Sequence, residues 1–375
     1  MAENKNTQAR KGQRNTDQLR SRKKIVLTGG GTAGHVTPNI ALLPGLREAG
    51  FDILYIGSKD GMEKDLIAAQ GIPYRGVSTG KFRRYLSAKN LSDPFRVLKG
   101  YSEAKDIIRK YRPDVLFSKG GFVSVPVVWA AAKYHVPVII HESDMTPGLA
   151  NKLCYGKAQK ICCNFPETLS RLPADKAVLT GTPIRAELLS GSREAGLAFT
   201  GFSPDKPVLL MMGGSSGARA LNQTLRAALD RILPDFQVIH LCGKGNVDTS
   251  LHQEGYVQYE YISKELPDLM AAADLVFSRA GANAICELLA LHKPNILVPL
   301  PLTASRGDQI LNARSFEKQG FSYVLEEEKL TEDTLLKAIH EVYQNRGRYI
   351  DAMKAGAQAD GTEAVLSLIR QAAGK

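Results

Sequence analysis

The sequence lacks several features that mark specialised classes of protein. No apolar run approaches the roughly 20 residues of a membrane-spanning helix, and residues 1–24 contain no apolar segment typical of a signal peptide. The five cysteines show no metal-ligand spacing and form no even set for disulfide pairing. These absences favour a globular protein with buried thiols in a reducing cytoplasm.

Positive charge is concentrated at the start of the sequence. The net charge is +11, and residues 1–24 carry eight Lys or Arg against Glu3 and Asp17. We expect this segment to be a disordered basic arm. It either contacts anionic lipid or nucleic acid or is simply solvated. The rest of the chain is mildly basic, which suits a phosphate-bearing substrate.

Short apolar strands alternate with helical segments in both halves of the chain, which predicts an α/β protein with parallel sheets covered on both faces. Residues 181–205, rich in Gly, Ser and Pro, are the predicted linker between the halves, and a helix starting near residue 37 is expected to kink or break at Pro44 and Gly45. Further helices are expected at 123–134, 218–233 and 362–373. The predicted strands are 25–28, 52–56, 114–117, 137–141, 208–212, 237–241, 275–278 and 295–299.

The segment Gly-Gly-Gly-Thr-Ala-Gly-His at positions 29–35 follows the first strand. It satisfies the G-x-G-x-x-G pattern, in which backbone amides at a helix N-terminus approach a phosphate. An NAD site also needs an acidic residue at the end of the second strand, which here ends in Gly57, Ser58 and Lys59. A P-loop would need Lys and Ser or Thr in place of His35 and Val36. A dehydrogenase therefore fits this sequence poorly, and an ATPase fits it even less well.

Three segments of the second half have related chemistry. Residues 213–218, Gly-Gly-Ser-Ser-Gly-Ala, form either a second phosphate loop or an ordinary strand-to-helix turn. A helix predicted to begin near Ala282 offers its N-terminal amides to a diphosphate. Glu287 in that helix either accepts ribose hydroxyls or is a solvated glutamate, and residues 305–309 suit sugar hydroxyls. Two such loops opening two successive α/β domains predict a ligand cleft between two lobes.

Together these motifs resemble the MurG family of bacterial transferases, which add N-acetylglucosamine to undecaprenyl-diphospho-N-acetylmuramoyl pentapeptide (lipid I) and so form lipid II for peptidoglycan. The resemblance begins near Lys24 and implies two Rossmann-like lobes facing across a cleft, the GT-B glycosyltransferase architecture. Residues 25–180 would be the acceptor and membrane-associating domain and 181–359 the UDP-N-acetylglucosamine domain, with a helix in 360–375 packing back on the first. The motifs lie at 32–35, 141–144, 148–151, 181–185, 213–215 and 280–287.

The resemblance also implies residue roles. Thr32, Ala33 and Gly34 would face the donor sugar and the acceptor diphosphate, Gln309 would bind sugar hydroxyls, and Asn151 would contact substrate. The nucleotide, its ribose and its diphosphate would be held by Arg185, Ser215, Ile262, Ala282, Asn283 and Glu287.

The family transfers the sugar with inversion of configuration at the anomeric carbon and without a metal in the protein. Because no D-x-D pair occurs near the loops either, we expect no metal and no cofactor. A direct attack needs a base for the C4 hydroxyl of the muramoyl sugar. His35 is the first candidate because its ordinary pKa lies near the working pH. Alternatively it orients the acceptor diphosphate or caps the turn, and Glu142 or Asp144 is the base.

Three positions depart from the family pattern. Ala33 stands where Gly is common, Asp144 where Asn is common, and Asp308 where Gln can occur. The two acids add negative charge beside the expected diphosphate cleft, so whether they contact substrate as in the family is left open.

Basic and apolar residues interleave at 81–86 and 95–99, a composition typical of a surface that binds a membrane interface, although a surface loop and an amphipathic helix fit as well. The expected membrane patch comprises Phe82, Arg83, Arg84, Tyr85, Leu86, Phe95, Lys99 and Trp129.

The expected partners are UDP-N-acetylglucosamine, the undecaprenyl-diphosphate acceptor, the anionic cytoplasmic face of the cell membrane, and other cell-wall synthesis or division proteins, with no nucleic acid. Two alternatives stay open. One is another UDP-sugar enzyme, such as a diacylglycerol glycosyltransferase or a UDP-N-acetylglucosamine 2-epimerase. The other is a non-catalytic nucleotide-binding scaffold of the division machinery.

Overall fold

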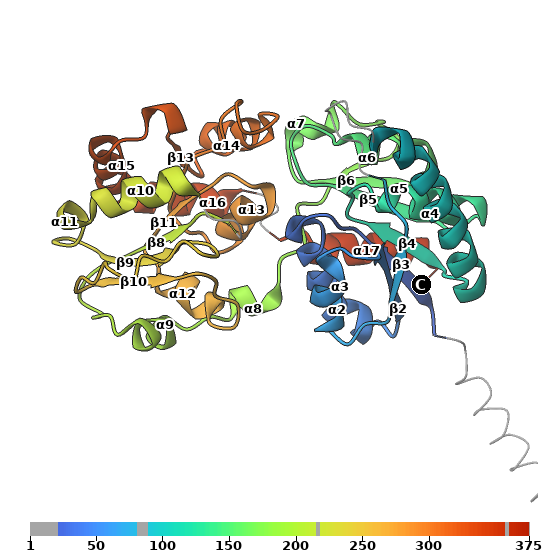
Figure 1. The fold of residues 1–375 in the computed structure, drawn as a ribbon, viewed down its shortest axis with the longest axis horizontal. Helices are drawn as coiled ribbons and strands as arrows, with labels where there is room; N and C mark the ends of the chain where they lie inside the picture. The colour runs from blue at the N-terminus through green and yellow to red at the C-terminus, as the bar shows by residue number, and fades with distance from the viewer. Residues whose placement is uncertain (1–21, 81–88, 215–217, 357–359, 375) are drawn as a thin grey trace, which may run out of the picture. The chain divides into compact units, whose positions relative to one another are not determined.

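A computed structural model gives the fold (Figure 1) and describes residues 22–80, 89–214, 218–356 and 360–374. The chain divides into two compact units. The first comprises the residues up to His141 together with 150–160 and 366 onward, and the second comprises 142–149 and 161–365. Most of the expected basic arm therefore lies outside the described residues.

The first sheet has seven strands in the order β3-β2-β1-β4-β5-β6-β7. Its interior strand β1 pairs in parallel with β2 on one side and β4 on the other. The middle of β1 is apolar and covered on both faces, so Ile25, Val26 and Leu27 are fully buried. Open α/β sheets bind ligands at the carboxyl ends of strands where the winding reverses, so the loops after β1 and β4 are the expected site. The strands are β1 (Lys24–Thr28), β2 (Asp52–Ser58), β3 (Tyr74–Val77), β4 (Val115–Ser118), β5 (Val138–Glu142), β6 (Lys160–Cys163) and β7 (Ala177–Leu179).

The helices along the first sheet connect its successive strands, as expected for parallel pairing. The longest, α4, packs against α5. They are η1 (Ala33–His35), α2 (Thr37–Glu48), α3 (Glu63–Ala68), α4 (Lys89–Tyr111), α5 (Ser124–Lys133), α6 (Leu149–Lys152), η2 (Tyr155–Lys157) and α7 (Pro166–Leu169).

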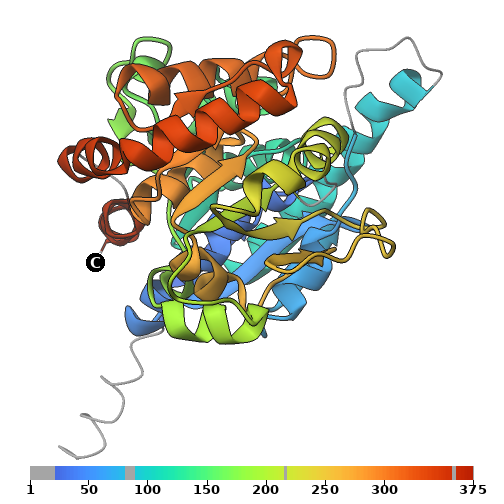
Figure 2. The same ribbon diagram turned by 90° about the vertical axis from the view of Figure 1, so that its left-hand side faces the viewer.

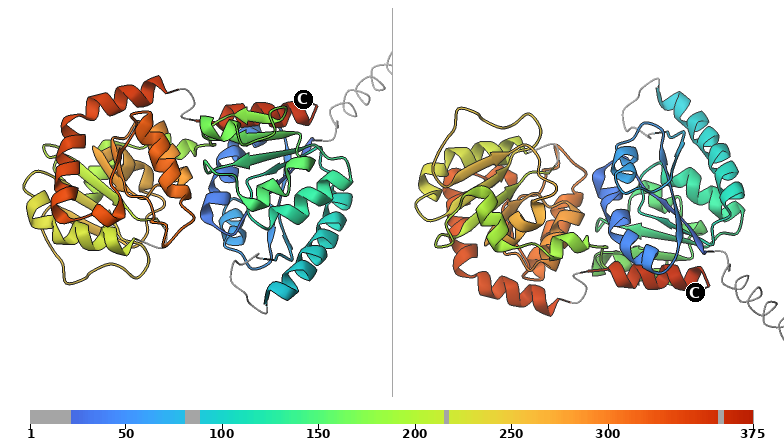
Figure 3. Two further views of the ribbon diagram at one scale, coloured as in Figure 1. Left: turned by 90° about the horizontal axis from the view of Figure 1, so that it is seen from above. Right: turned by 90° about the horizontal axis from the view of Figure 1, so that it is seen from below.

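The α2 helix runs through Pro44 without the predicted break. A proline inside a helix costs about 3 kcal/mol, but Leu42, Leu43 and Leu46 are buried by the helix and their packing outweighs this cost. Gly45 has a separate reason, because a Cβ there would overlap the Leu366 side chain. Leu366 belongs to the last helix, α17 (Thr362–Ala372), which thus packs on α2 within the first unit (Figure 3).

The second sheet has six strands in the order β10-β9-β8-β11-β12-β13, and its strand pairs are parallel. Its winding reverses between β8 and β11, so the loops after these strands form the second expected ligand edge. The strands are β8 (Val208–Met212), β9 (Gln237–Leu241), β10 (Tyr256–Tyr259), β11 (Leu275–Ser278), β12 (Asn295–Leu297) and β13 (Tyr323–Val324).

Helices cover the second sheet in the same way, and α15 packs along β11 and β12 (Figure 2). The single helix predicted over 218–233 is divided into α10 and α11. The helices are α8 (Ala186–Leu189), α9 (Arg193–Thr200), α10 (Arg219–Ala227), α11 (Leu229–Ile232), α12 (Leu266–Ala272), α13 (Ala282–Ala290), α14 (Asp308–Lys318), η3 (Glu327–Lys329), α15 (Glu332–Gln344) and α16 (Arg346–Ala355).

The segment predicted as a linker, 181–205, contains the two helices α8 and α9. Some of its small polar residues mark the ends of α9. The Ser192 hydroxyl accepts the backbone N–H of Ala195 and caps the start of α9, and Gly201, at φ 71°, ends this helix in the left-handed conformation. Gly and Ser are common both in linkers and at capped helix ends, so composition alone does not distinguish the two.

The predicted α/β class, with two parallel sheets, is confirmed. Across the described ranges, no helix combines the length and the apolar character that crossing a membrane requires.

Candidate functional site

The first glycine loop joins β1 to η1 at the carboxyl edge of the first sheet, as predicted. The packing and the backbone conformation of this loop require its glycines. A Cβ on Gly29 would overlap the backbone oxygen of His35, and one on Gly30 would lie 2.5 Å from Oε1 of Glu63. Gly31 has φ 87°, a conformation that side chains other than glycine rarely adopt. The loop is therefore packed from beneath, and only its outer side is open to a ligand.

The carboxylate beneath this loop belongs to Glu63, the first residue of α3, which is fully buried. One oxygen accepts the backbone N–H of Ser58 at 2.9 Å and its hydroxyl at 2.5 Å, and the other accepts the N–H of Gly31 at 3.3 Å. Sequence reasoning missed Glu63, since an acidic residue at a helix start is ordinarily explained by the helix dipole.

His35 is held by the same loop. Its Nδ1 lies 3.0 Å from the Gly30 carbonyl oxygen and 3.1 Å from the Thr32 hydroxyl. A carbonyl oxygen only accepts, so Nδ1 carries a hydrogen and Nε2 of the neutral ring has a free lone pair. Burial and the Lys119 ammonium lower the pKa of His35, against the opposing effects of the Gly30 bond and the Glu63 charge. The ring is thus uncharged near neutral pH and able to accept a proton at Nε2.

A second buried pair lies near this loop. Lys119 follows β4, and its ammonium donates to Nδ1 of His141 at 2.8 Å. Both side chains are almost completely buried. The Asn151 amide, on α6, donates to the His141 carbonyl oxygen at 3.1 Å. The first unit therefore brings together His35, Lys119 and the predicted residue Asn151 near the loops after β1 and β4.

The alternative bases are engaged within the second unit. Glu142 accepts the backbone N–H of Gly148 at 2.9 Å and so closes the loop after β5. Asp144 accepts the Asn312 amide at 3.0 Å. His35, by contrast, uses only Nδ1 in its two hydrogen bonds, which involve the Gly30 carbonyl oxygen and the Thr32 hydroxyl.

Arg185 and Glu287 form an ion pair with Nη2 and Oε1 at 3.3 Å. Arg185 stands before α8, and Glu287 lies in α13 with its side chain 16% exposed. Burial raises the pKa of Glu287 and the guanidinium opposes this rise. The alternative of a solvated glutamate is therefore wrong. Ala282 and Asn283 form the first turn of the same helix, so these four predicted residues belong to one part of the second unit.

The remaining predicted donor residues are distributed around the second sheet. Ser215 lies outside the described residues. Ile262 follows β10 and is partly buried, and Asp308 opens α14. The Gln309 oxygen accepts the backbone N–H of Leu300 at 3.1 Å and so supports the loop after β12. Its amide nitrogen is the part left for a sugar hydroxyl.

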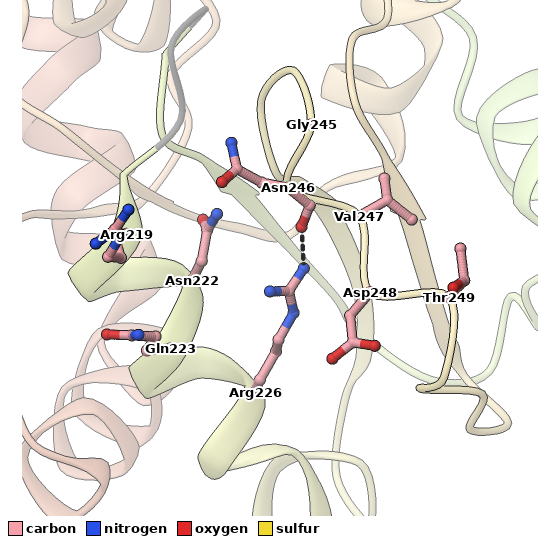
Figure 4. Close-up of a pocket in the computed structure, with 9 residues that line it drawn as sticks. All are labelled: Arg219, Asn222, Gln223, Arg226, Gly245, Asn246, Val247, Asp248 and Thr249. Carbon is pink, nitrogen blue, oxygen red and sulfur yellow. Dashed lines mark hydrogen bonds between the residues drawn. The ribbon is translucent and has the colours of Figure 1, made fainter.

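A cavity of about 410 Å³ lies between α10 and the loop after β9 (Figure 4). Arg226 crosses one side of it and donates to the Asn246 carbonyl oxygen and the Gln258 side-chain oxygen, at 2.5 and 2.8 Å. None of the predicted site residues lines this cavity. These hydrogen bonds of Arg226 hold the loop in place beside α10. The position of the loop relative to this helix explains the cavity.

The expected membrane patch is described only in part, since residues 82–86 lie outside the described ranges. Phe95 on α4 is 74% exposed and Lys99 on the same helix is also exposed. Trp129 on α5 is partly exposed, and its indole N–H donates to the Leu153 carbonyl oxygen at 3.0 Å. Exposed apolar and cationic side chains thus occur on two helices that pack together.

Comparison with known proteins matches two separate regions of the chain. The family model of the glycosyltransferase family 28 N-terminal domain matches residues 25–163, and that of its C-terminal domain matches 208–367.

Individual proteins match over almost the whole chain. A Lachnoclostridium phytofermentans protein named UDP-N-acetylglucosamine--N-acetylmuramyl-(pentapeptide) pyrophosphoryl-undecaprenol N-acetylglucosamine transferase is 63% identical over 93% of this chain and 99% of its own. The crystal structure of a MurG from Acinetobacter baumannii has a TM-score of 0.75 at 26% identity, over 93% of this chain and 99% of that one. A UDP-N-acetylglucosamine 2-epimerase structure from Listeria monocytogenes, described there as putative, has a TM-score of 0.68 at 11% identity and covers 94% of this chain and 96% of its own, so it shares the fold alone.

Proposed function

Because the chain belongs to glycosyltransferase family 28, we propose that it transfers N-acetylglucosamine from UDP-N-acetylglucosamine to undecaprenyl-diphospho-N-acetylmuramoyl pentapeptide, which forms lipid II. The observation that carries this function is the 63% identity, over nearly the full length of both chains, to a relative that is named for this reaction. The family resemblance predicted from the motifs is confirmed.

In the proposed reaction His35 is the base. Its Nε2 takes the proton of the acceptor C4 hydroxyl while that oxygen attacks the anomeric carbon of the donor. The bond from this carbon to the terminal phosphate oxygen breaks, and UDP leaves with the bonding electrons. The hydrogen bond from Nδ1 to the Gly30 carbonyl supports the role, because it fixes the tautomer with its lone pair on Nε2.

The donor would be bound by the second unit. At the N-terminus of α13, Ala282 and Asn283 would offer backbone N–H groups and the positive end of the helix dipole to the diphosphate. Glu287 offers carboxylate oxygens to the ribose hydroxyls, and Arg185 holds this carboxylate and offsets the charge of the leaving UDP. Ser215, Ile262 and Gln309 complete the proposed donor contacts. On the acceptor side, the proposed contacts are made by Thr32, Ala33 and Gly34.

We further propose that the protein acts peripherally at the cytoplasmic face of the membrane. The exposed Phe95, Lys99 and Trp129 side chains support this, because apolar groups insert into the acyl boundary while cations attract anionic headgroups. The acceptor of the proposed reaction is itself a membrane lipid.

The test incubates the full chain with UDP-N-acetylglucosamine and either a lipid I analogue or diacylglycerol in mixed micelles. UDP release and a new disaccharide lipid are expected only with the lipid I analogue. Transfer to diacylglycerol, or epimerisation of the donor without any acceptor, would assign the chain to another UDP-sugar activity. His35→Ala and Glu287→Ala variants that leave both turnover and cell-wall synthesis unchanged would favour a non-catalytic scaffold.

A further inference from the structure

The Glu63 carboxylate and the His35 imidazole bind opposite ends of one peptide group. The Gly30 carbonyl accepts from His35 Nδ1 at 3.0 Å, and the N–H of the same peptide, that of Gly31, donates to Glu63 Oε2 at 3.3 Å. The histidine and the carboxylate are thus connected through two hydrogen bonds and a single amide.

We propose that Glu63 is a positioning residue for the transferase reaction, acting on His35 through the peptide group that joins Gly30 to Gly31. The inference rests on the proposed role of His35 as the base. No proton moves along the chain: Nδ1 keeps its hydrogen, the amide keeps its own, and the substrate proton is bound at Nε2.

The chain of bonds has two physical effects. A carboxylate that accepts from an amide N–H polarises the amide, which makes its carbonyl oxygen a stronger acceptor. The Gly30 oxygen then holds Nδ1–H more firmly, so the ring is kept in the tautomer and orientation that the reaction needs. When the ring becomes an imidazolium, the negative charge beyond the peptide stabilises it, as a directly bonded carboxylate does in serine hydrolases.

The local sequence is arranged to hold this carboxylate close to the loop. Three donors satisfy its oxygens, two of them from Ser58 and one from Gly31. Glycines at 30, 57 and 61 make room for it, since a Cβ at each position would contact the Glu63 side chain at 2.9 Å or less. Within the described part of the chain Glu63 forms no ion pair, so its charge is not cancelled locally.

The charged groups that act on His35 come from two packed elements. Glu63 on α3 raises the pKa of the ring, whereas Lys119, after β4, lowers it together with burial. The opposite signs give the proposal a measurable direction. Loss of the Glu63 charge leaves burial and Lys119 less opposed, so His35 should lose its proton at a lower pH.

The principal variant is Glu63→Gln, which keeps the size of the side chain and an oxygen for Ser58 but removes the charge. We expect kcat to fall about ten- to a hundred-fold, which is at or below the roughly 10²–10⁴-fold that an acid–base group itself contributes, because Glu63 only positions the base. The acidic limb of the pH profile of kcat/KM should move to lower pH, while KM for UDP-N-acetylglucosamine stays unchanged. A merely structural role would lower activity without moving this limb.

Tyr74→Phe is the matched control. It removes a buried hydroxyl of the same cluster, which donates to the Ser58 carbonyl oxygen at 2.5 Å, and leaves the carboxylate in place. Its acidic limb should coincide with that of the unmodified protein. An unmoved limb in Glu63→Gln, or an equal movement in Tyr74→Phe, would overturn the proposal.

A reciprocal variant covers the case in which Glu63→Gln does not fold. Lys119→Met removes the opposing charge with similar volume, and the limb should then move to higher pH. An unmoved limb here would likewise overturn the electrostatic account. If the unmodified protein transfers no sugar to the lipid I analogue, the result contradicts the proposed function, on which this inference rests. If the unmodified protein is active, the pH profiles of the variants test this inference alone.

Discussion

The stability of the second unit should fall in acid because of His240 in β9. Its Nε2 lies 3.1 Å from the Asn222 amide oxygen, which can only accept, so Nε2 carries the hydrogen. Its Nδ1, 2.8 Å from the Tyr256 hydroxyl, accepts from that group. The ring is fully buried and every nitrogen is satisfied in the neutral form. Burial, and secondarily the Arg226 charge, lower the pKa of His240 to about 3.

The sign and size of the effect follow from proton binding. An unfolded histidine becomes charged below about pH 6.5, whereas folded His240 stays neutral until the pH approaches its pKa of about 3. The unfolded state therefore binds more protons between these values, and stability is lost as the pH falls through this window. At pH 4.5, about two units below the unfolded value, the loss from this group is about 3 kcal/mol.

The assay is urea unfolding followed by circular dichroism at pH 7 and pH 4.5. His240→Gln removes the titration but can still donate to Asn222 and accept from Tyr256. Its free energy of unfolding should drop by about 3 kcal/mol less than that of the unmodified chain over the same interval. His252→Gln, at an exposed histidine of the same unit, controls for the substitution. An identical drop in His240→Gln and in the unmodified chain would refute the reasoning.

Three further predictions concern other parts of the molecule. Gly45→Ala should destabilise the first unit by about 1–3 kcal/mol in urea titrations despite its better helix propensity, because the added methyl would overlap Leu366; a gain in stability would contradict that packing. Arg185→Ala should weaken binding of UDP-N-acetylglucosamine at least about ten-fold in calorimetry, since it removes the guanidinium proposed to offset the diphosphate charge and a hydrogen bond to a charged group contributes about 1.5–3 kcal/mol. Unchanged affinity would remove Arg185 from the donor site. Phe95→Ser should reduce binding to anionic vesicles about ten-fold, from the roughly 1.5–3 kcal/mol of one buried apolar side chain, whereas Phe199→Ser, at an exposed position of the second unit, should not.

The sequence predicted the sheets better than the segments between them. A strand buried on both faces contains a continuous apolar run, as at 25–27 in β1, and this signal depends on neighbouring residues alone. The helix ends at Ser192 and Gly201 were not predicted, because capping residues and linker residues have the same composition. The course of α2 through Pro44 depends on packing against distant residues, which no local pattern contains.

The candidate site shows the same division. The glycine loop and His35 were found because their spacing along the chain is itself the signal. Glu63 and Lys119 were not, because the first is brought to the loop by α3 and the second by β4, and each resembles an ordinary surface residue in the sequence. The ion pair of Arg185 with Glu287 also joins residues that are distant in the chain, and only the fold shows that it is buried.

The position of α17 has a consequence for synthesis of the protein. Residues from 366 onward belong to the first unit, where Leu366 lies against Gly45, so one unit combines the beginning and the end of the described chain. A ribosome makes the N-terminal part first, and the surface of α2 around Gly45 must wait for almost all of the remaining residues before its partner exists. The second unit, whose residues are complete before α17 is finished, can fold during this delay. Premature termination near residue 360 would leave a chain without α17 and with an apolar helix surface uncovered, and such a product is a natural substrate for chaperones and proteases.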